Sequence, residues 1–323
     1  MTARGPRVVL LLGLLCAVTA AAAQTDAKTP GLIRIVVPFS PGGSNDVVAR
    51  AIAPVLAKRL GNTVIVDNRP GAAGVVGADS VAKAPRDASA ILLTSSTFLT
   101  TAATQSRVPY DPIAAFAPVA MVAQGPLLVA IPSSASFKSV RDLLAAARAR
   151  PGALNYGSAG VGSAGQMATE LLNAAANIQI THVPYKGAAE ALIDLASGRI
   201  DLMISNYSSL VPQLKSGRVT GIAVTSQQPS PAFPELPPLA ATVPGYAIEI
   251  WVGVLAPAGT PAPLIQRLNR EINEIALSTE LRAFLEPDGA TASPMSPAAF
   301  AARITEDLAQ WKRIASERKI TVD

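Results

Sequence analysis

The stretch "VVPFSPGGSNDVVAR", residues 36–50, contains the transition on which the fold prediction rests. A β-branched run ends in a Pro/Gly loop, and a segment with helical spacing of apolar residues follows it. Gly42 and Gly43 lack Cβ atoms, so backbone N–H groups of the loop can approach a ligand closely. A glycine loop before a helix N-terminus favours anions. The alternative is a tight turn in which Ser44 or Asp46 only caps the helix, and this stretch alone leaves both interpretations open.

The pattern of this stretch repeats along the chain. Strand-like runs at 33–39, 63–68 and 89–95 alternate with helical patterns at 46–60 and 75–84, which predicts a parallel sheet covered by helices. A long β-like run at 117–132 opens a second set of alternating segments that extends to residue 226. A Pro-rich connection, a further strand at 247–257 and two helices at 261–277 and 297–317 complete the chain. We therefore predict an α/β protein with one domain at 24–122 plus 248–323 and a second at 123–247.

The N-terminus has the features of a secretory signal. Arg4 and Arg7 precede an apolar run at 8–18, and three alanines end at Ala23, so we expect cleavage there and export of a soluble chain to the periplasm. The apolar run is too short to span a bilayer unaided. Cys16 is the only cysteine, and Leu15 before it is too large for the usual lipoprotein signal.

Charge and composition exclude one class of partner. Loss of Arg4 and Arg7 with the signal lowers the formal net charge from +5 to +3, and aromatic residues make up 4% of the sequence. Nucleic-acid binding requires a basic stripe and stacking aromatic rings, and the sequence contains neither, so no nucleic-acid partner is expected.

The segment "GSAGVGSAG", residues 157–165, contains a G-x-G-x-x-G pattern between a strand and a helix. The ribose-binding acid expected about 20 residues further on is absent, because Tyr185 stands there. Gln166 occupies the position where a P-loop needs lysine. We therefore expect a second anion-binding loop, with no nucleotide cofactor.

Two further polar segments follow predicted strands. Thr94, Ser95 and Ser96 come after one strand and Ser205 and Asn206 after another, where open α/β sheets bind ligands. Each alone is typical of an ordinary polar loop. Together with the two glycine loops they favour one ligand site assembled from four loops.

Catalysis and metal binding find little support. His182 is the only histidine, and one histidine without cysteines does not supply a metal cluster. No serine stands in a recognisable activating motif, and the acidic residues fall mostly on predicted helix faces. A structural role for His182 is favoured over a catalytic one, and we expect no catalytic residue, metal or cofactor.

With these loops in hand, the chain resembles the extracytoplasmic solute receptors of tripartite tricarboxylate transporters, also called Bug-type receptors. The matching segments include "IRIVVPFSPGGSNDVVARAIAPVLAKRLG", "VIVDNRPGAAGVVGADSVAKA", "NYGSAGVGSAGQMATELL" and "HVPYKGAAEALIDLASGRIDLMI". The resemblance implies a two-domain type II periplasmic-binding-protein fold that closes over a small carboxylate: a di- or tricarboxylate, an acidic amino acid or an aromatic acid.

The resemblance also implies the site residues. They are Phe39, Pro41, Gly42, Gly43, Ser44, Asn45 and Asp46 in the first loop, Thr94, Ser95 and Ser96 in the second, Ser158, Ala159, Gly162, Ser163 and Gln166 in the other domain, and Tyr185, Lys186, Ser205 and Asn206 nearby. Many family members have an acid where this chain has Ser205. Because that acid would pair with a ligand ammonium group, we expect a plain carboxylate rather than an amino acid.

The function predicted from the sequence is a monomeric periplasmic solute-binding protein that delivers a small organic anion to the membrane components of a tripartite transporter. Two alternatives from other classes remain. One is a ligand sensor that docks a membrane sensor protein. The other is a secreted hydrolase that uses a loop serine with His182.

Overall fold

The computed structural model describes residues 30–39, 41–42, 44–185 and 187–321. The predicted signal peptide at 1–23 and two of the predicted site residues, Gly43 and Lys186, lie outside the described residues.

Six strands of the described chain form one sheet in the order β11-β4-β10-β3-β1-β2. Their bounds are Leu32–Val37 (β1), Thr63–Asn68 (β2), Ala90–Ser95 (β3), Phe116–Pro126 (β4), Glu249–Pro257 (β10) and Thr291–Ala292 (β11). Strand β1 pairs in parallel with β2 and β3, which confirms the parallel arrangement predicted for these three strands. Strand β10 runs antiparallel to both β3 and β4, so the whole sheet is mixed.

We call this sheet and its helices the first lobe. The α-helices of its described residues are Ser44–Leu60 (α1), Val75–Ala82 (α2), Thr97–Thr104 (α3), Ala262–Ala276 (α8), Thr279–Leu285 (α9) and Pro297–Glu317 (α10), and Ala72–Gly74 (η1) and Glu286–Asp288 (η3) are 3-10 helices. Both faces of the sheet are covered, because Ile33, Ile35 and Val37 pack into one core cluster while Val36 between them packs into another.

Two helices of the first lobe were not expected from the sequence. Helix α3 follows β3 where a polar Ser/Thr loop was predicted, and α9, capped by Ser278, lies beyond the end of the helix predicted at 261–277. Helix α3 is rich in threonine, which disfavours helices, but Phe98 and Leu99 are buried in the core. Tertiary packing therefore decides its conformation.

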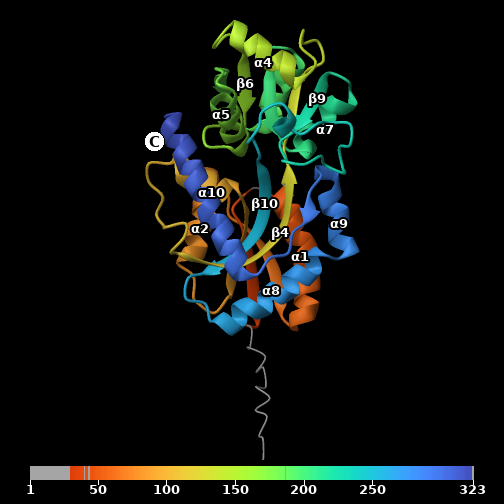
Figure 1. Cartoon of the computed structure of the whole chain (residues 1–323). Helices are drawn as coiled ribbons and strands as arrows, with labels where there is room; N and C mark the ends of the chain where they lie inside the picture. The colour runs from red at the N-terminus through yellow and green to blue at the C-terminus, as the bar shows by residue number, and fades with distance from the viewer. Residues whose placement is uncertain (1–29, 40, 43, 186, 322–323) are drawn as a thin grey trace, which may run out of the picture.

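Five strands of the described residues form a second sheet, in the order β7-β6-β8-β5-β9. Their bounds are Leu128–Pro132 (β5), Asn155–Ser158 (β6), Thr181–Pro184 (β7), Leu202–Ser205 (β8) and Val219–Val224 (β9). The accompanying helices are Val140–Ala149 (α4), Ala164–Ala176 (α5), Ala188–Ala196 (α6), Tyr207–Lys215 (α7) and the 3-10 helix Leu239–Ala241 (η2). We call this unit the second lobe; the two lobes lie one above the other (Figure 1).

The chain crosses between the sheets at two places that are hydrogen-bonded to each other. At the first crossing, β4 and β5 are separated only by Leu127, so the single run predicted at 117–132 is two strands in different sheets. The second crossing leads from β9 to β10 and begins at Thr225, whose side chain is fully buried. The Thr225 hydroxyl accepts a hydrogen bond from Leu127 N at 2.7 Å, and Thr225 N donates to Leu127 O at 2.9 Å. Ile248 N donates to Thr225 O at 2.9 Å.

Helix α10 extends from the first lobe along the side of the second (Figure 1). It packs against α3 and β4 and, near its C-terminal end, against α5. Just beyond it, Arg318 Nε lies 2.7 Å from a carboxylate oxygen of Glu170 on α5. The last helix therefore connects the two lobes.

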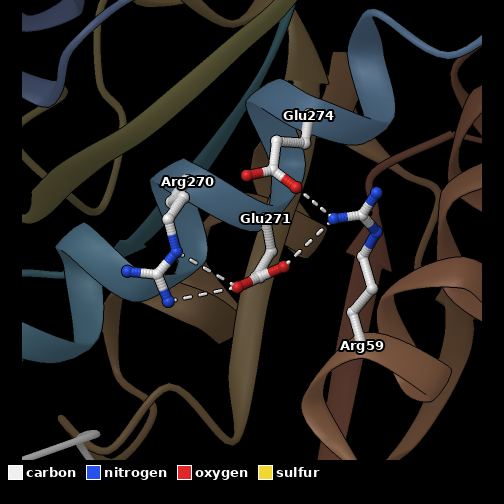
Figure 2. A network of polar contacts seen from close by, with 4 residues as sticks. All are labelled: Arg59, Arg270, Glu271 and Glu274. Atoms are coloured by element: carbon white, nitrogen blue, oxygen red, sulfur yellow. Dashed lines mark hydrogen bonds and ion pairs between the residues drawn. The ribbon is translucent and has the colours of Figure 1, made fainter.

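A network of ion pairs joins α1 and α8 on the surface of the first lobe, away from the crossings. Arg59 at the end of α1 pairs with Glu271 and Glu274 of α8, and Arg270 pairs with Glu271 at 3.1 Å (Figure 2). Such exposed networks contribute little stability per pair, about 1 kcal/mol or less. Within the described ranges, no helix has the length and apolarity that crossing a membrane requires.

Candidate ligand-binding site

A cavity of about 820 Å³ is lined by residues of both lobes. The first lobe contributes Ser95 at the end of β3 and Val252 of β10, and the second contributes Ser205 at the end of β8 and the loop after β6. Leu127 at the first crossing also lines the cavity. The cavity therefore lies at the junction of the two lobes, beside the crossing segments.

Helix N-termini converge on this cavity. Five α-helices of the described chain contribute their first residue or the residue before it: Ser44 of α1, Thr97 of α3, Ser163 and Ala164 of α5, Gly187 and Ala188 of α6, and Asn206 before α7. The first N–H groups of a helix have no partner within the helix, and the helix dipole places partial positive charge there. Among the described lining residues Asp288 is the sole charged one, and none carries positive charge. This environment suits an anion held by N–H groups and hydroxyls.

Asp46 fixes the first glycine loop through a hydrogen bond to its backbone at Gly42. Its side chain is buried, and one oxygen accepts hydrogen bonds from Gly42 N at 2.9 Å and from Arg50 Nε at 2.9 Å. The other oxygen accepts from the Asn68 amide at 2.9 Å. The hydrogen bond from Arg50 is the largest cause that lowers the pKa of Asp46 to about 2, and the bonds from Gly42 and Asn68 add to it. Asp46 therefore stays ionised and fixes the loop.

The loop of the second lobe is held by three side chains. Gln166 Oε1 accepts a hydrogen bond from Gly162 N at 2.7 Å, and the Ser158 hydroxyl accepts one from Gly160 N at 3.2 Å. The two imidazole nitrogens of His182 lie 2.7 Å from Ser158 Oγ and 3.1 Å from Gln166 Nε2. Ser163 caps α5, since its hydroxyl accepts a hydrogen bond from Gln166 N at 3.4 Å.

The structure separates the predicted site residues into two groups. The residues that line the cavity are Phe39, Gly42, Ser44, Asn45, Ser95, Ala159, Gly162, Ser163, Ser205 and Asn206. The residues that do not are Pro41, Asp46, Thr94, Ser96, Ser158, Gln166 and Tyr185. Two of the second group hold the backbone of the first in place: Asp46 accepts from Gly42 N and Gln166 accepts from Gly162 N. Others hold neighbouring segments. Ser96 Oγ accepts a hydrogen bond from Trp251 N at 2.9 Å, and Tyr185 OH donates to Asp194 at 2.8 Å. As ligand contacts, both groups stay predictions.

Other lining residues were not singled out from the sequence. They include Ala73, Thr97, Thr101, Gln124, Gly125, Leu127, Val161, Ser208, Ser209, Ile250, Val252, Phe284 and Asp288. About half of them lie in β4, β10, α9 and η3, far in sequence from the four loops: Gln124, Gly125, Ile250, Val252, Phe284 and Asp288.

Ser158 and His182 lie close together, which no sequence motif had indicated. This contact bears on the hydrolase alternative, in which a loop serine acts with His182. Ser158 is 1% exposed and does not line the cavity. Its hydroxyl donates to Gly160 O at 3.0 Å, and the other imidazole nitrogen faces an amide instead of a carboxylate. A nucleophile needs access to substrate and a base oriented by an acceptor. The pair meets neither condition and fits a structural role.

The fold and the cavity define a solute-binding protein with a ligand cleft between two lobes. The model of the tripartite tricarboxylate transporter family receptor matches residues 48–320. BugT of Bordetella pertussis is 33% identical over 316 residues, 96% of this chain and 97% of BugT. The UPF0065 protein in the tcbD-tcbE intergenic region of a Pseudomonas species is 36% identical over 97% of this chain and 95% of its own length.

Solved structures agree. A protein from R. palustris with adipate is 35% identical, with a TM-score of 0.79 over 90% of this chain and 98% of that one. The periplasmic binding protein BugD is 29% identical, with a TM-score of 0.76 over 90% of this chain and 98% of its own. MatC from Rhodopseudomonas palustris, with bound malate, is 28% identical, with a TM-score of 0.75 over 88% of this chain and 98% of its own.

The chain belongs to the tripartite tricarboxylate transporter receptor family. The resemblance stated from sequence and the predicted two-domain fold class are thereby confirmed. The members of this family are periplasmic receptors and not enzymes, which confirms the prediction of a receptor over a hydrolase.

Proposed function

We propose that this receptor is a monomer that captures a small organic carboxylate, either a di- or tricarboxylate or an aromatic acid, by closing its lobes over it. The observation that carries this proposal is the convergence of five helix N-termini on a cavity without a described basic lining residue. Hydrogen bonds to a charged group contribute about 1.5–3 kcal/mol each, so three or four of them can support micromolar binding after the cost of association. The relatives with adipate and with malate support the same ligand class.

The residues proposed to contact the ligand are the predicted site residues. Those that line the cavity would donate to it directly, and those beneath would fix the loops. Two of them, Gly43 and Lys186, lie outside the described residues. Gly43 is proposed from its place in the glycine loop and from the family resemblance, and Lys186 from the resemblance alone. The small and apolar lining, for example Ala73, Val161 and Val252, would face the hydrocarbon part of the ligand.

We propose that the chain is exported and that its signal is cleaved after Ala23, so the mature receptor begins at Gln24. Its partners would be the membrane components of a tripartite transporter. The proposed domains are 24–122 plus 248–323 and 123–247. Mass spectrometry of the protein recovered from the periplasm checks the cleavage site, and light scattering checks the monomer.

A thermal-shift screen of the mature protein tests the proposed ligand class. The panel contains adipate, malate, benzoate and glutamate, with dimethyl adipate as a control of nearly the same shape and no charge. A ligand that binds only the folded protein raises Tm. We expect at least one plain carboxylate to raise Tm and dimethyl adipate to leave it unchanged. Equal shifts from adipate and its ester, or no shift from any carboxylate, would contradict the proposal.

A further inference from the structure

The loop of the second lobe rests on a chain of hydrogen bonds in which each proton has one consistent position. Gln166 Oε1 accepts from Gly162 N at 2.7 Å, which identifies the oxygen end of this amide. The nitrogen end, a donor only, therefore faces His182 Nδ1 at 3.1 Å. For this contact to be a hydrogen bond, His182 Nδ1 must be the unprotonated, accepting nitrogen.

The remaining protons follow from this assignment. A neutral imidazole with a bare Nδ1 carries its proton on Nε2 and donates it to Ser158 Oγ, 2.7 Å away. Ser158 Oγ then donates its own proton to Gly160 O at 3.0 Å and accepts from Gly160 N at 3.2 Å. Each of these contacts then pairs one donor with one acceptor. The neutral Nε2–H form of His182 thus fixes both ends of the loop at 160–162, part of which lines the cavity.

A second proton on His182 is incompatible with this arrangement. It would sit on Nδ1 and point at the Gln166 amide hydrogens, so two donors would face each other. Turning the amide would relieve that contact but would point the same hydrogens at Gly162 N–H. Either way a buried donor loses its acceptor, which costs more than an average hydrogen bond contributes. The imidazolium form therefore weakens the hold on Gly162, while its Nε2–H can still donate to Ser158.

The surroundings of the imidazole favour its neutral form. Its ring stacks on Tyr156 of β6, with centroids 4.8 Å apart. Burial lowers the pKa of His182, and the carboxylate of Glu170 on α5 opposes this. Glu170 is itself occupied: it accepts from Tyr156 OH at 2.7 Å and pairs with Arg318 at 2.7 Å. No described carboxylate is hydrogen-bonded to either ring nitrogen.

We propose that neutral His182 is a positioning residue for ligand binding: it holds the loop at 160–162, and its protonation weakens the affinity of the receptor for its ligand. This inference rests on the proposed carboxylate-binding function. The ligand touches the loop and not the imidazole, because His182 does not line the cavity.

The sequence makes a direct test practical, because His182 is the only histidine in the chain. Long-range ¹H–¹⁵N spectra of uniformly labelled mature protein report one imidazole, and the ¹⁵N shifts distinguish its tautomers. We expect the Nε2–H tautomer at pH 7.5. The Nδ1–H tautomer would overturn the hydrogen-bond assignment and with it the proposal.

The second measurement is the pH titration of the same imidazole, with and without saturating adipate. Coupling between two binding events is reciprocal, so a ligand that prefers neutral His182 must lower the midpoint of its titration. We expect the ligand-bound midpoint to fall by an amount that corresponds to roughly three- to tenfold weaker binding to the protonated receptor. Identical midpoints in the free and bound protein would overturn the proposal, whatever the affinity for adipate.

Two variants separate positioning from general structural support. His182→Gln keeps an amide donor for Ser158 but cannot be charged. As the pH is lowered, the adipate affinity of this variant should therefore fall less than the adipate affinity of wild type. Because both proteins bind the same probe, ionisation of adipate itself cancels in the comparison. Gln166→Glu offers a carboxylate to Nδ1 and should raise the midpoint of the imidazole titration. Parallel pH profiles for wild type and His182→Gln would contradict the proposal.

Failure of the proposed function would look different. If no carboxylate of the panel binds at pH 7.5, the proposed function fails, and the tautomer in the free protein still tests the hydrogen-bond chain. If adipate does not bind but another panel carboxylate does, that carboxylate replaces it in the titration.

Discussion

The carboxylate of Asp288 in the first lobe accepts two hydrogen bonds from Ser208 in the second, from the backbone nitrogen at 2.7 Å and from the hydroxyl at 3.1 Å. Ser208 is the second residue of α7, so Asp288 satisfies an N-terminal N–H group of a helix in the opposite lobe. Both residues line the cavity. The contact therefore joins the lobes beside the ligand site and exists only while they are close together.

Asp288→Ala is expected to weaken ligand affinity about three- to tenfold, because it removes a contact that only the closed form makes. The contact is exposed to solvent, which keeps the effect below the range of about 1.5–3 kcal/mol for charged hydrogen bonds. Isothermal titration with adipate measures the affinity, and small-angle scattering measures the opening of the unliganded protein. Glu286→Ala, on the same turn but paired at 3.9 Å with Arg282 of its own lobe, is the matched control. Equal affinity of Asp288→Ala and wild type would show that the contact does not stabilise closure.

Asp46 makes the stability of the first loop depend on pH. Its pKa falls from 3.8 to about 2 in the folded protein, so its contribution is fully present above about pH 4 and is lost as pH falls through about 2. The shift corresponds to up to about 2 kcal/mol, reduced by solvent screening because the Arg50 side chain is 55% exposed. Urea unfolding should find Asp46→Asn less stable than wild type at pH 6, with a smaller difference at pH 2.5.

The control for this prediction is Asp67→Asn. It removes a carboxylate paired with Arg69 at 2.9 Å at the surface, and we expect a smaller loss of stability at pH 6. A difference between Asp46→Asn and wild type that is the same at both pH values would contradict the role of the Asp46 charge.

Ser205→Asp tests the selectivity inferred from the missing acid. Ser205 lines the cavity, so a carboxylate there can pair with an ammonium group on the ligand. We expect the variant to bind glutamate better relative to glutarate, by about tenfold or less, as measured by isothermal titration. Ser209→Asp adds the same charge elsewhere on the cavity wall and serves as the control. An unchanged ratio in Ser205→Asp, or the same gain in both variants, would remove Ser205 as a selectivity marker.

Two glycines that line the cavity should respond very differently to a methyl group. A Cβ on Gly165 would come within 2.3 Å of Ile204 O, so Gly165→Ala must push the start of α5 away from β8. A Cβ on Gly187 meets nothing within 4 Å, and its φ of 178° is open to any residue. We expect Gly165→Ala to lose about 1–3 kcal/mol of unfolding free energy and most ligand affinity, and Gly187→Ala to keep its stability. Thermal unfolding and titration check both; similar stability of the two variants would contradict the close packing.

The sequence predicted most of the elements because their local signals are strong. The capping serine Ser139 and the apolar spacing after it marked α4, and short strand-like apolar runs marked β1, β2 and β3. Helix α3 was not predicted, because its threonines disfavour a helix and its helical form depends on the burial of Phe98 and Leu99.

The candidate site could be predicted in part for a similar reason. Glycine loops and polar strand ends are local patterns, so the residues they contain could be named. Ser158 and His182 are 24 residues apart and Ser208 and Asp288 are 80 apart, so their pairing depends on the fold. The distinction between residues that line the cavity and residues that hold them also requires the three-dimensional structure.

The hydrogen bonds of Thr225 have a mechanical consequence. Thr225 is hydrogen-bonded to both Leu127 and Ile248, so the two crossing segments are joined to each other and do not act as two independent connections. Two hydrogen-bonded segments resist twisting more than a single segment would, because twisting separates their bonded atoms. Twisting the lobes against each other would therefore stretch or break these hydrogen bonds, whereas a bend that keeps the two segments side by side can leave them intact.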